Sequence, residues 1–317
     1  MTCFHPLKGV RYRYEYDPTR IITTFKRSEM REVEHDRYAY VVSEIKAPCG
    51  QCIGCRLEKS RQWAMRCVSE LQMHAQACFL TLTYNNENLP EDGSVSKKFF
   101  KDWLKKFRES IRRRTGDCIR FFACGEYGSK FQRPHYHVII FGFCPNDLQI
   151  HKTTRNGDVL YVSEWLKEKW PYGFHTVGKV TFESCAYVAR YCTKKYMGKH
   201  PEKHYGTLEP EFVHMSRRNG IGYEWFKKFH KDVFPNDVFI FKGKTLRPPT
   251  YFDHLLKKLD FEEYHEVKLN REEKFLESPW ALLSDEELQV DLDRREKVLH
   301  ERFKKYMHRN YEESLQC

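Results

Sequence analysis

The chain has 317 residues, of which 40% are hydrophobic, so it can bury the core of one large domain or two ordinary ones. Its net charge of +11 is uneven: residues 1–250 carry 43 Lys and Arg against 27 Asp and Glu, a net of +16, whereas residues 251–317 carry 12 against 17, a net of −5. The sequence contains neither a long apolar run nor a signal-peptide pattern, so we expect a cytoplasmic protein without a membrane partner. The basic excess favours a polyanionic partner, nucleic acid first of all.

The first 45 residues are rich in Tyr, Arg and Thr, and we expect irregular to β structure there. Three cysteines follow at two-residue spacing with glycines between them, Cys49, Cys52 and Cys55. Such spacing is typical of a chain that wraps a tetrahedral zinc ion, so these residues are candidate ligands of a structural Zn²⁺. The best candidates for the fourth ligand are Cys3 and His5, with Cys67 behind them. Reduced structural cysteines and an iron–sulfur cluster stay open as alternatives.

The central part of the chain alternates helical and extended patterns. A helix over about 57–75 is followed by a strand over 77–84, and Ser96 is expected to cap a helix that runs to about residue 114. Strands at about 119–125 and 135–143, a helix at about 162–170 and a strand at about 174–180 follow. The last strand leads into a helix that Thr181 can cap. This order predicts an α+β fold, with an antiparallel sheet that carries helices on one face in the ferredoxin-like manner.

Beyond residue 200 the pattern loosens. The segment 216–222 is a basic, glycine-bearing loop that suits a phosphate backbone, although an ordinary surface turn is equally compatible. From Tyr251 the chain is charged and helical, and Ser284 with Glu287 forms the pattern of a capping box. We therefore divide the chain into an N-terminal segment with the cysteines (1–56), a central domain (57–200), and a basic loop with a charged helical C-terminal extension (201–317).

Two histidines on one strand suggest a metal site. Because side chains alternate along a strand, His135 and His137 share one face and Tyr136 lies on the other. Glu126 ends the preceding strand, and a hairpin between the two strands would bring its carboxylate near the imidazoles. Two imidazoles and one carboxylate leave open positions on a divalent ion, which can polarise a phosphoryl oxygen. For the histidine pair alone, satisfied surface histidines are the commoner explanation.

The helix after the fourth strand carries candidate nucleophiles. Tyr187 and Tyr191 are four residues apart and Lys194 lies seven residues after Tyr187, so the three side chains share one helix face. Two hydroxyl groups and an ammonium in one row suit attack on a phosphodiester. Half-buried packing tyrosines and a solvated lysine are the alternative.

These stretches, taken in order, resemble the three motifs of HUH-type replication initiators. More narrowly, they are similar to the replication initiation proteins of microviruses, the small single-stranded DNA phages, and among them the gokushoviruses. The strand over 79–84 resembles the first motif, residues 133–137 the metal motif, and residues 187–194 the two-tyrosine nucleophile motif. Tyr136 departs from the usual His-hydrophobic-His pattern but is still bulky. The resemblance spans roughly residues 45–225, including the cysteines and the 216–222 loop.

The resemblance implies an HUH endonuclease domain over 57–200 that nicks the viral-strand origin. One tyrosine would become joined to the 5′ phosphate, and the second would act after one replication circuit so that the displaced strand is religated into a circle. It also implies Mg²⁺ or Mn²⁺ at the catalytic site, single-stranded origin DNA as substrate, and host helicase, polymerase and single-strand-binding protein as partners in the host cytoplasm. The residues expected to contact DNA are Arg133, Arg190, Lys195, Arg217 and Arg218.

Two rival functions stay open. One is a plasmid or transposon nuclease of the same fold. The other is a zinc-containing nucleic-acid-binding protein without catalysis, which would make the paired histidines and tyrosines coincidental. An SDS-resistant protein–DNA adduct would distinguish the two classes, because only an enzyme with a nucleophile forms one.

Overall fold

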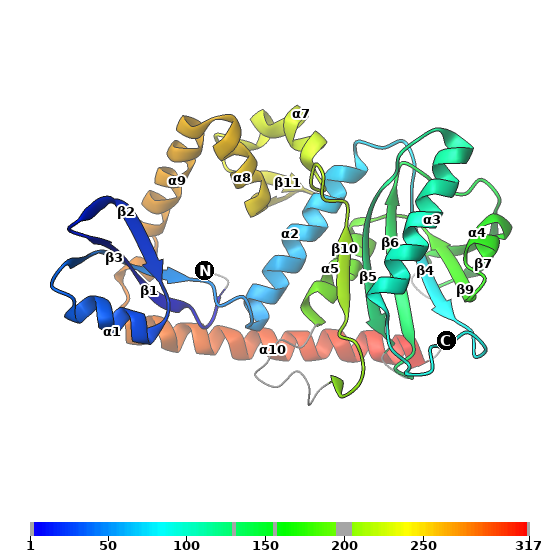
Figure 1. Cartoon of the computed structure of the whole chain (residues 1–317), viewed down its shortest axis with the longest axis horizontal. Coiled ribbons are helices and arrows are strands. Elements are labelled where there is room, and N and C mark those ends of the chain that lie inside the picture. The colour runs from blue at the N-terminus through cyan, green and yellow to red at the C-terminus, as the bar shows by residue number, and fades with distance from the viewer. Residues whose placement is uncertain (1–2, 129–130, 155–156, 195–204, 316–317) are drawn as a thin grey trace. The chain divides into compact units, whose positions relative to one another are not determined.

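The computed structural model describes residues 3–128, 131–154, 157–194 and 205–315, without the side chains of residues 190–194 and 303–315. The chain forms two compact units (Figure 1). The first unit is made of the two ends of the chain, residues 1–58 and 282–317, and the second contains residues 59–281.

The first unit contains a three-stranded antiparallel sheet of order β2-β1-β3. Its elements are β1 (Leu7–Tyr14), β2 (Asp17–Thr24), α1 (Arg27–His35), β3 (Ala39–Ala47) and the long helix α10 (Asp285–Leu315). A small core of Val10, Tyr12 and Val33 joins α1 to the sheet. The predicted capping box at the start of α10 is confirmed: the N–H of Glu287 donates to Ser284 Oγ at 3.2 Å, and the N–H of Ser284 donates to the Glu287 carboxylate at 2.8 Å.

The second unit is built on a seven-stranded sheet of order β10-β5-β6-β4-β9-β8-β7, in which every neighbouring pair is antiparallel. Its strands are β4 (Ala77–Tyr84), β5 (Arg120–Tyr127), β6 (Pro134–Phe141), β7 (Leu148–Thr153), β8 (Val159–Ser163), β9 (Gly173–Gly178) and β10 (Phe212–Met215). The predicted α+β class and antiparallel sheet are therefore confirmed. The sequence patterns missed β7 and β8, which extend the sheet beyond β9.

Helices cover both faces of this sheet, which corrects the expectation of helices on one face (Figure 1). The two crossover helices, α3 (Lys97–Thr115) and α4 (Glu164–Lys169), pack on one face, as predicted. The helices α2 (Ile53–Leu71) and α5 (Phe182–Lys194) pack on the other. The physical reason is that the central strand β6 is apolar on both sides: Val138 and Ile140 belong to the α3 core, whereas Ile139 and Phe141 belong to the α5 core, and all four are 0% exposed.

Two predicted helix starts are confirmed. Ser96 Oγ accepts the backbone N–H of Phe99 at 3.3 Å at the start of α3, and Gly116 ends that helix in the left-handed conformation with a φ of 79°. Thr181 Oγ1 accepts the N–H of Ser184 at 3.2 Å at the start of α5. The apolar stripe of α3 is thereby aligned with the sheet, where Trp103 and Phe107 stack with ring centroids 4.9 Å apart.

The second unit continues past residue 200, where the sequence suggested a boundary. Its remaining elements are α7 (Tyr223–Val233), β11 (Phe239–Phe241), β12 (Lys244–Leu246), α8 (Thr250–Leu259), α9 (Phe261–Leu276) and a short 3₁₀ helix (Pro279–Leu282). Trp225, Phe252 and Leu256 lie in a third core that holds these elements together. Among the described residues, none of the helices is both long enough and apolar enough to cross a bilayer.

Candidate active site and metal centres

The strand register brings Glu126, His135 and His137 to one face of the sheet. Glu126 of β5 is paired directly with His135 of β6, and Cys124 is paired with His137. Cys124 packs in the core beneath α5, so the three polar side chains face the tyrosine helix. His137 Nε2 lies 2.8 Å from Glu126 Oε1, and the two side chains are 5% and 4% exposed. The hairpin predicted from the sequence therefore forms and places the carboxylate beside the histidine pair.

His137 is fixed on its other sides by the neighbouring strand β4. Thr81, its register partner, places Oγ1 3.1 Å from His137 Nδ1. Phe79 stacks on the imidazole with a centroid distance of 5.7 Å and an interplanar angle of 5°. The ring is thus held by a hydrogen bond at each nitrogen and by a parallel aromatic face. Partners of this kind orient metal-ligating histidines, so Thr81 and Phe79 are positioning residues for any ion held here.

His135 has an unsatisfied nitrogen that fits a metal ligand. Its Nδ1 atom is buried and has no hydrogen-bond partner within the described part of the chain. Burial, together with the neighbouring His137, lowers the pKa of His135, so the neutral form that binds metals is favoured. The ring centroids of the two histidines are 6.4 Å apart. Two neutral imidazoles and a carboxylate are a donor set for a divalent cation, although these donor atoms are not gathered as tightly as the cysteines described below.

Tyr136, between the histidines, lies in the opposite core and is 0% exposed. It stacks on Phe100 of α3 with a centroid distance of 4.9 Å. Its hydroxyl lies 3.2 Å from the Tyr84 hydroxyl and accepts the N–H of Ser96 at 3.2 Å. Burial raises the pKa of Tyr136 to about 12, so this phenol stays neutral. A tyrosine can therefore replace the usual apolar residue because its hydroxyl finds partners inside the core.

Tyr187 of α5 lies next to the histidine and carboxylate. Its ring centroid is 5.2 Å from that of His137 and 6.3 Å from that of Phe79, both in edge-on geometry. The Tyr187 side chain is 36% exposed, so a substrate can reach it. The backbone of Arg190, Tyr191 and Lys194 belongs to α5, but their side chains lie outside the described atoms, and Lys195 lies outside the described residues.

The basic residues expected to contact DNA differ in their surroundings. The Arg133 guanidinium donates to the carbonyl of Tyr84 at 2.8 Å and to Asn86 Oδ1 at 2.6 Å, so it fastens the end of β4 near the histidines. Arg217 and Arg218 are exposed on the 216–222 loop. The structure therefore gives Arg133 an evident local role and leaves the two loop arginines accessible to a ligand.

The backbone of the 216–222 loop is anchored to the body of the second unit. The buried carboxylate of Glu70 accepts the N–H of Gly222 at 2.6 Å, and Arg66 Nε donates to the carbonyl of Ile221 at 3.0 Å. Arg66 itself lies between the rings of Trp63 and Tyr251, at 4.0 and 3.9 Å from their centroids. Arg120 donates to the carbonyls of residues 218 and 219 at 3.4 and 2.5 Å. These contacts hold the loop in one conformation while its arginines stay exposed.

The four cysteines Cys3, Cys49, Cys52 and Cys55 form a metal-binding cluster in the first unit. Their sulfur atoms all lie within 4.8 Å of one another, and among the described residues they are the group of potential ligands gathered this closely. Cys3 is thus the fourth member, whereas His5 lies 2.8 Å from Glu296 and Cys67 is buried in the core beneath α5. Four thiols at this spacing fit a tetrahedral ion such as Zn²⁺.

Backbone N–H groups surround the sulfurs of this cluster. The N–H of Cys49 donates to Cys3 Sγ at 3.2 Å, and the N–H of Cys52 donates to Cys49 Sγ at 3.3 Å. Burial opposes ionisation, yet the N–H groups of Cys52 and Gln51 bring the pKa of the Cys49 thiol down to about 7. Burial raises the pKa of Cys3 and Cys55. The turn thus supplies the donors that a metal-bound thiolate needs.

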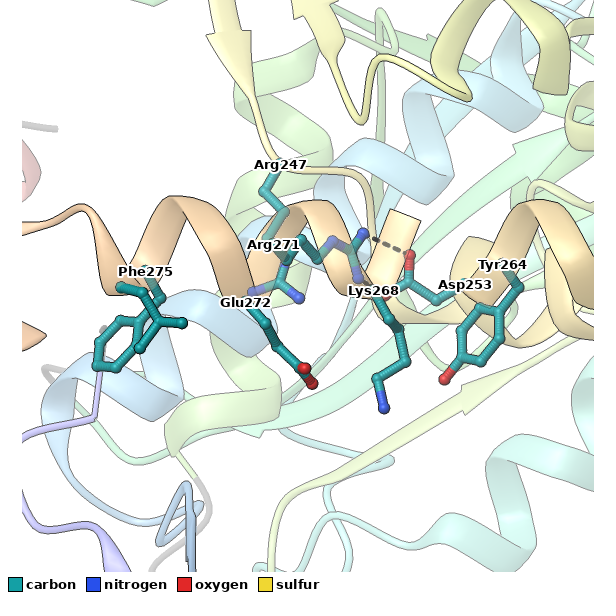
Figure 2. A pocket seen from close by; sticks show the side chains of 8 residues that line it. Arg247, Asp253, Tyr264, Lys268, Arg271, Glu272 and Phe275 are labelled. Carbon is teal, nitrogen blue, oxygen red and sulfur yellow. Dashed lines mark hydrogen bonds and ion pairs between the residues drawn. The ribbon is translucent and has the colours of Figure 1, made fainter. Parts of the chain in front are cut away.

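A pocket of about 570 Å³ in the second unit lies away from these residues (Figure 2). Arg271 donates to Asp253 at 2.8 and 2.9 Å and also to Asp237, so two carboxylates already satisfy this guanidinium. Lys268 and Tyr264 line the same pocket. With its most buried charge already neutralised, the pocket resembles a structural ion-pair site rather than a reaction centre.

Sequence reasoning missed several residues that position the site. Thr81 and Phe79 were recognised only as part of a core strand, although the alternation of β4 already places them on the face that β6 turns towards α5. Glu70, Arg66 and Arg120 carried no signal, because their partners lie about one hundred residues or more away in the sequence.

Comparison with known proteins identifies the family. A family model described as replication-associated protein ORF2 matches residues 77–196, which include all the candidate catalytic residues. The chain is 35% identical over 236 residues to replication-associated protein VP4 of Bdellovibrio phage phiMH2K, which covers 71% of this chain and 73% of the relative. It is 33% identical over 237 residues to replication-associated protein ORF2 of Spiroplasma virus 4, with 71% and 72% covered, and 29% identical over 221 residues to replication-associated protein ORF4 of Chlamydia phage 1, with 68% and 55% covered. No solved structure matches the chain. The chain therefore belongs to the replication-associated protein family of microvirus-type phages.

Proposed function

We propose that this chain is an HUH-type endonuclease that nicks the viral-strand origin and starts rolling-circle replication of a single-stranded DNA phage. The observation that carries the proposal is the position of Tyr187, whose ring lies 5.2 Å from His137, which in turn contacts Glu126 at 2.8 Å. A partly exposed phenol beside a buried histidine–carboxylate pair is an arrangement for nucleophilic attack on a phosphodiester. The names of the relatives, which refer to phage replication, support this assignment.

The strand order supports the fold assignment. The elements β4, α3, β5, β6, α4 and β9 follow one another along the chain, and their strands lie in the order β5-β6-β4-β9. This is the ferredoxin-like arrangement, with β6 in the interior of the sheet. The histidine pair therefore occupies a central strand, where both flanking strands add residues to the same site.

In the proposed reaction, the Tyr187 or Tyr191 oxygen forms a bond to the phosphorus and the bond between the phosphorus and the 3′ oxygen breaks. The tyrosine loses its proton and the departing 3′ oxygen gains one, so the products are a 5′-phosphotyrosyl link and a free 3′ hydroxyl. A divalent ion, Mg²⁺ or Mn²⁺, held by Glu126, His135 and His137 would supply charge to polarise a phosphoryl oxygen. A free tyrosine has a pKa of about 10, so the nucleophile needs such a neighbouring positive charge or the Lys194 ammonium.

Religation uses the second tyrosine. Tyr187 and Tyr191 are one helical turn apart, so a phosphate held at the site lies within reach of both after a small shift. While one carries the 5′ end, the other cuts the regenerated origin, and the released 3′ hydroxyl attacks the first link to close the circle. On this proposal the protein acts inside the host cell with host helicase, polymerase and single-strand-binding protein, and the four cysteines hold a structural Zn²⁺.

The test is to trap and map the covalent link. The native protein, incubated with single-stranded fragments of its phage genome and Mn²⁺, should form an SDS-resistant adduct whose peptide carries the nucleotide on Tyr187 or Tyr191. The double variant Tyr187→Phe, Tyr191→Phe should bind DNA almost normally yet form no adduct, whereas Tyr196→Phe should behave as the native protein.

An adduct mapped to another residue would show that the nucleophile lies elsewhere. Binding without any adduct in the native protein would favour a nucleic-acid-binding protein without catalysis.

A further inference from the structure

A row of basic side chains lies on the face of the sheet opposite the histidines. We name the basic stripe the set of Lys97, Lys101 and Arg108 on α3 and Arg217 on the 216–222 loop, all of which are exposed. Positions 97, 101 and 108 recur at helical spacing and share one face of α3. Because α3 packs on the Tyr136 face, the stripe is separated from the candidate catalytic site by the thickness of the sheet.

Ring contacts place the stripe along the outer edge of the sheet. Lys97 Nζ lies 5.9 Å from the ring centroid of Phe212 on β10, and the Arg108 guanidinium lies 5.6 Å from that of Phe121 on β5. His214 of β10 lies between them, 5.2 Å from Phe121. Burial, together with Lys101, Lys97, Arg217 and Arg108, lowers the pKa of His214 to about 4. The four cations therefore act on one small region beside the edge strand.

The charges of the stripe are not neutralised by the protein. Within the described residues none of the four has an ion pair with a carboxylate; Glu209 accepts only the backbone N–H of Lys97, at 3.3 Å. By contrast, Arg112 and Arg113, one turn further along α3, both pair with Glu109. Like charges four residues apart on a helix destabilise it unless an anion binds. The stripe thus has the electrostatic character of a surface that receives an external polyanion.

The dimensions and composition of the stripe indicate which polyanion fits. Eleven residues of helix separate Lys97 from Arg108, which corresponds to about 16 Å. Over that length one strand of duplex DNA carries about five phosphates. The rings beneath the cations are buried, with Phe121 3% and Phe212 8% exposed, so they offer no platform for stacking unpaired bases. The surface is suited to a phosphate backbone rather than to splayed bases.

We propose that the basic stripe binds the phosphate backbone of duplex DNA that flanks the single-stranded cleavage site. The identity of the polyanion as DNA rests on the proposed function. The anchored 216–222 loop, held by Glu70, Arg66 and Arg120, keeps Arg217 beside the α3 cations and so completes the surface. Duplex held at this edge would leave the opposite face of the sheet to the strand that is cut.

The experiment compares two triple variants of the full chain by fluorescence anisotropy. The stripe variant is Lys97→Gln, Lys101→Gln, Arg108→Gln, and the control variant is Lys227→Gln, Lys228→Gln, Lys231→Gln on α7, which removes the same charge from the same unit, away from the stripe. Glutamine keeps the helix propensity, so both should fold. The probes are a fluorescein-labelled blunt duplex and labelled polythymidine.

The stripe variant should lower the slope of log affinity against log salt for the duplex by about 2.7, or about 0.9 per lost cation. Raising the salt from about 50 to about 200 mM should then weaken duplex binding by the native protein about 40-fold more than binding by the stripe variant. The control variant should keep the native slope, and adduct formation on a short single-stranded origin fragment should be native in both variants.

Three results would overturn the proposal: an unchanged duplex slope in the stripe variant, an equal drop in the control variant, or a drop for polythymidine without one for the duplex. The adduct readout separates this proposal from the one it rests on. A native protein that forms no adduct refutes the nuclease assignment, whereas the duplex slopes test the stripe independently.

Discussion

Replacing Thr81 with valine tests whether β4 orients His137. The substitution keeps the size and the β-branched shape that a strand favours, and removes only the oxygen that lies 3.1 Å from His137 Nδ1. That nitrogen would then lack its partner in a side chain that is 5% exposed. The cost should be about 1–1.5 kcal/mol, towards the low end for an unsatisfied buried polar group, because Phe79 still stacks on the ring. For a unit of this size the melting temperature should fall by about 3–6 °C.

The larger effect should be on the reaction. Loss of a partner that orients a metal-ligating histidine reduces metal affinity or activity by about 10–100-fold, and the remaining stack on Phe79 argues for about 10-fold. The assay is adduct yield on an SDS gel across a series of Mn²⁺ concentrations, with thermal unfolding measured in parallel. Thr83→Val is the matched control, because Thr83 lies on the same face of β4 and is paired with His135. Native metal dependence in Thr81→Val, or an equal loss in Thr83→Val, would refute the reasoning.

Three further predictions follow from other contacts. Purified protein should contain about one zinc per chain, retained in Cys118→Ser, whose site is exposed, but lost in Cys52→Ser; a folded, active, metal-free preparation would contradict this. Glu70→Gln should lower the free energy of unfolding by about 2–3 kcal/mol, less than for a fully buried pair, since the Arg120 side chain 2.5 Å away is 19% exposed. Although burial opposes it, His74, the N–H of Gly222 and Arg120 lower the pKa of Glu70, so this stability is present above the unfolded pKa of about 4.3 and is lost as pH falls through the folded pKa; the gap in unfolding free energy between native and variant should close in acid. Tyr136→Phe should cost about 1 kcal/mol in chemical denaturation and leave adduct formation native, because its hydroxyl serves only the α3 core.

Local patterns predicted the elements that local interactions determine. Ser96 caps α3 because a side-chain oxygen three residues before the N–H it accepts is a sequence-local arrangement. The pairing of Glu126 with His135 follows from a short connection between two strong strands, which leaves few registers that keep both apolar faces buried. The cysteine spacing similarly restricts how a chain can turn back on itself, and Cys3 was among the candidates named to complete the group. The catalytic and metal roles of these residues stay predictions.

Patterns could not predict which layer a helix joins. The α5 helix has an apolar face compatible with either side of the sheet, and only the fully apolar character of β6 on both sides implies a second helical layer. The strands β7 and β8 carry largely exposed or half-buried side chains, so their alternation gives a weak signal. The anchors of the 216–222 loop join residues up to 155 positions apart, and such pairs leave no trace in a local window.

The alternation of β6 separates two requirements that a nuclease must satisfy within one strand. Its even positions, from Tyr136 to Ile140, pack against α3 and are sealed by the hydroxyl contacts of Tyr136 in the core. Its odd positions begin with the histidines under α5 and end with apolar residues that hold that helix on the sheet. Since a shift of one residue would exchange the two faces, the packing of Tyr136 fixes the register that aims both imidazoles at the tyrosine helix. The core of one layer thus determines the geometry of the chemistry in the other.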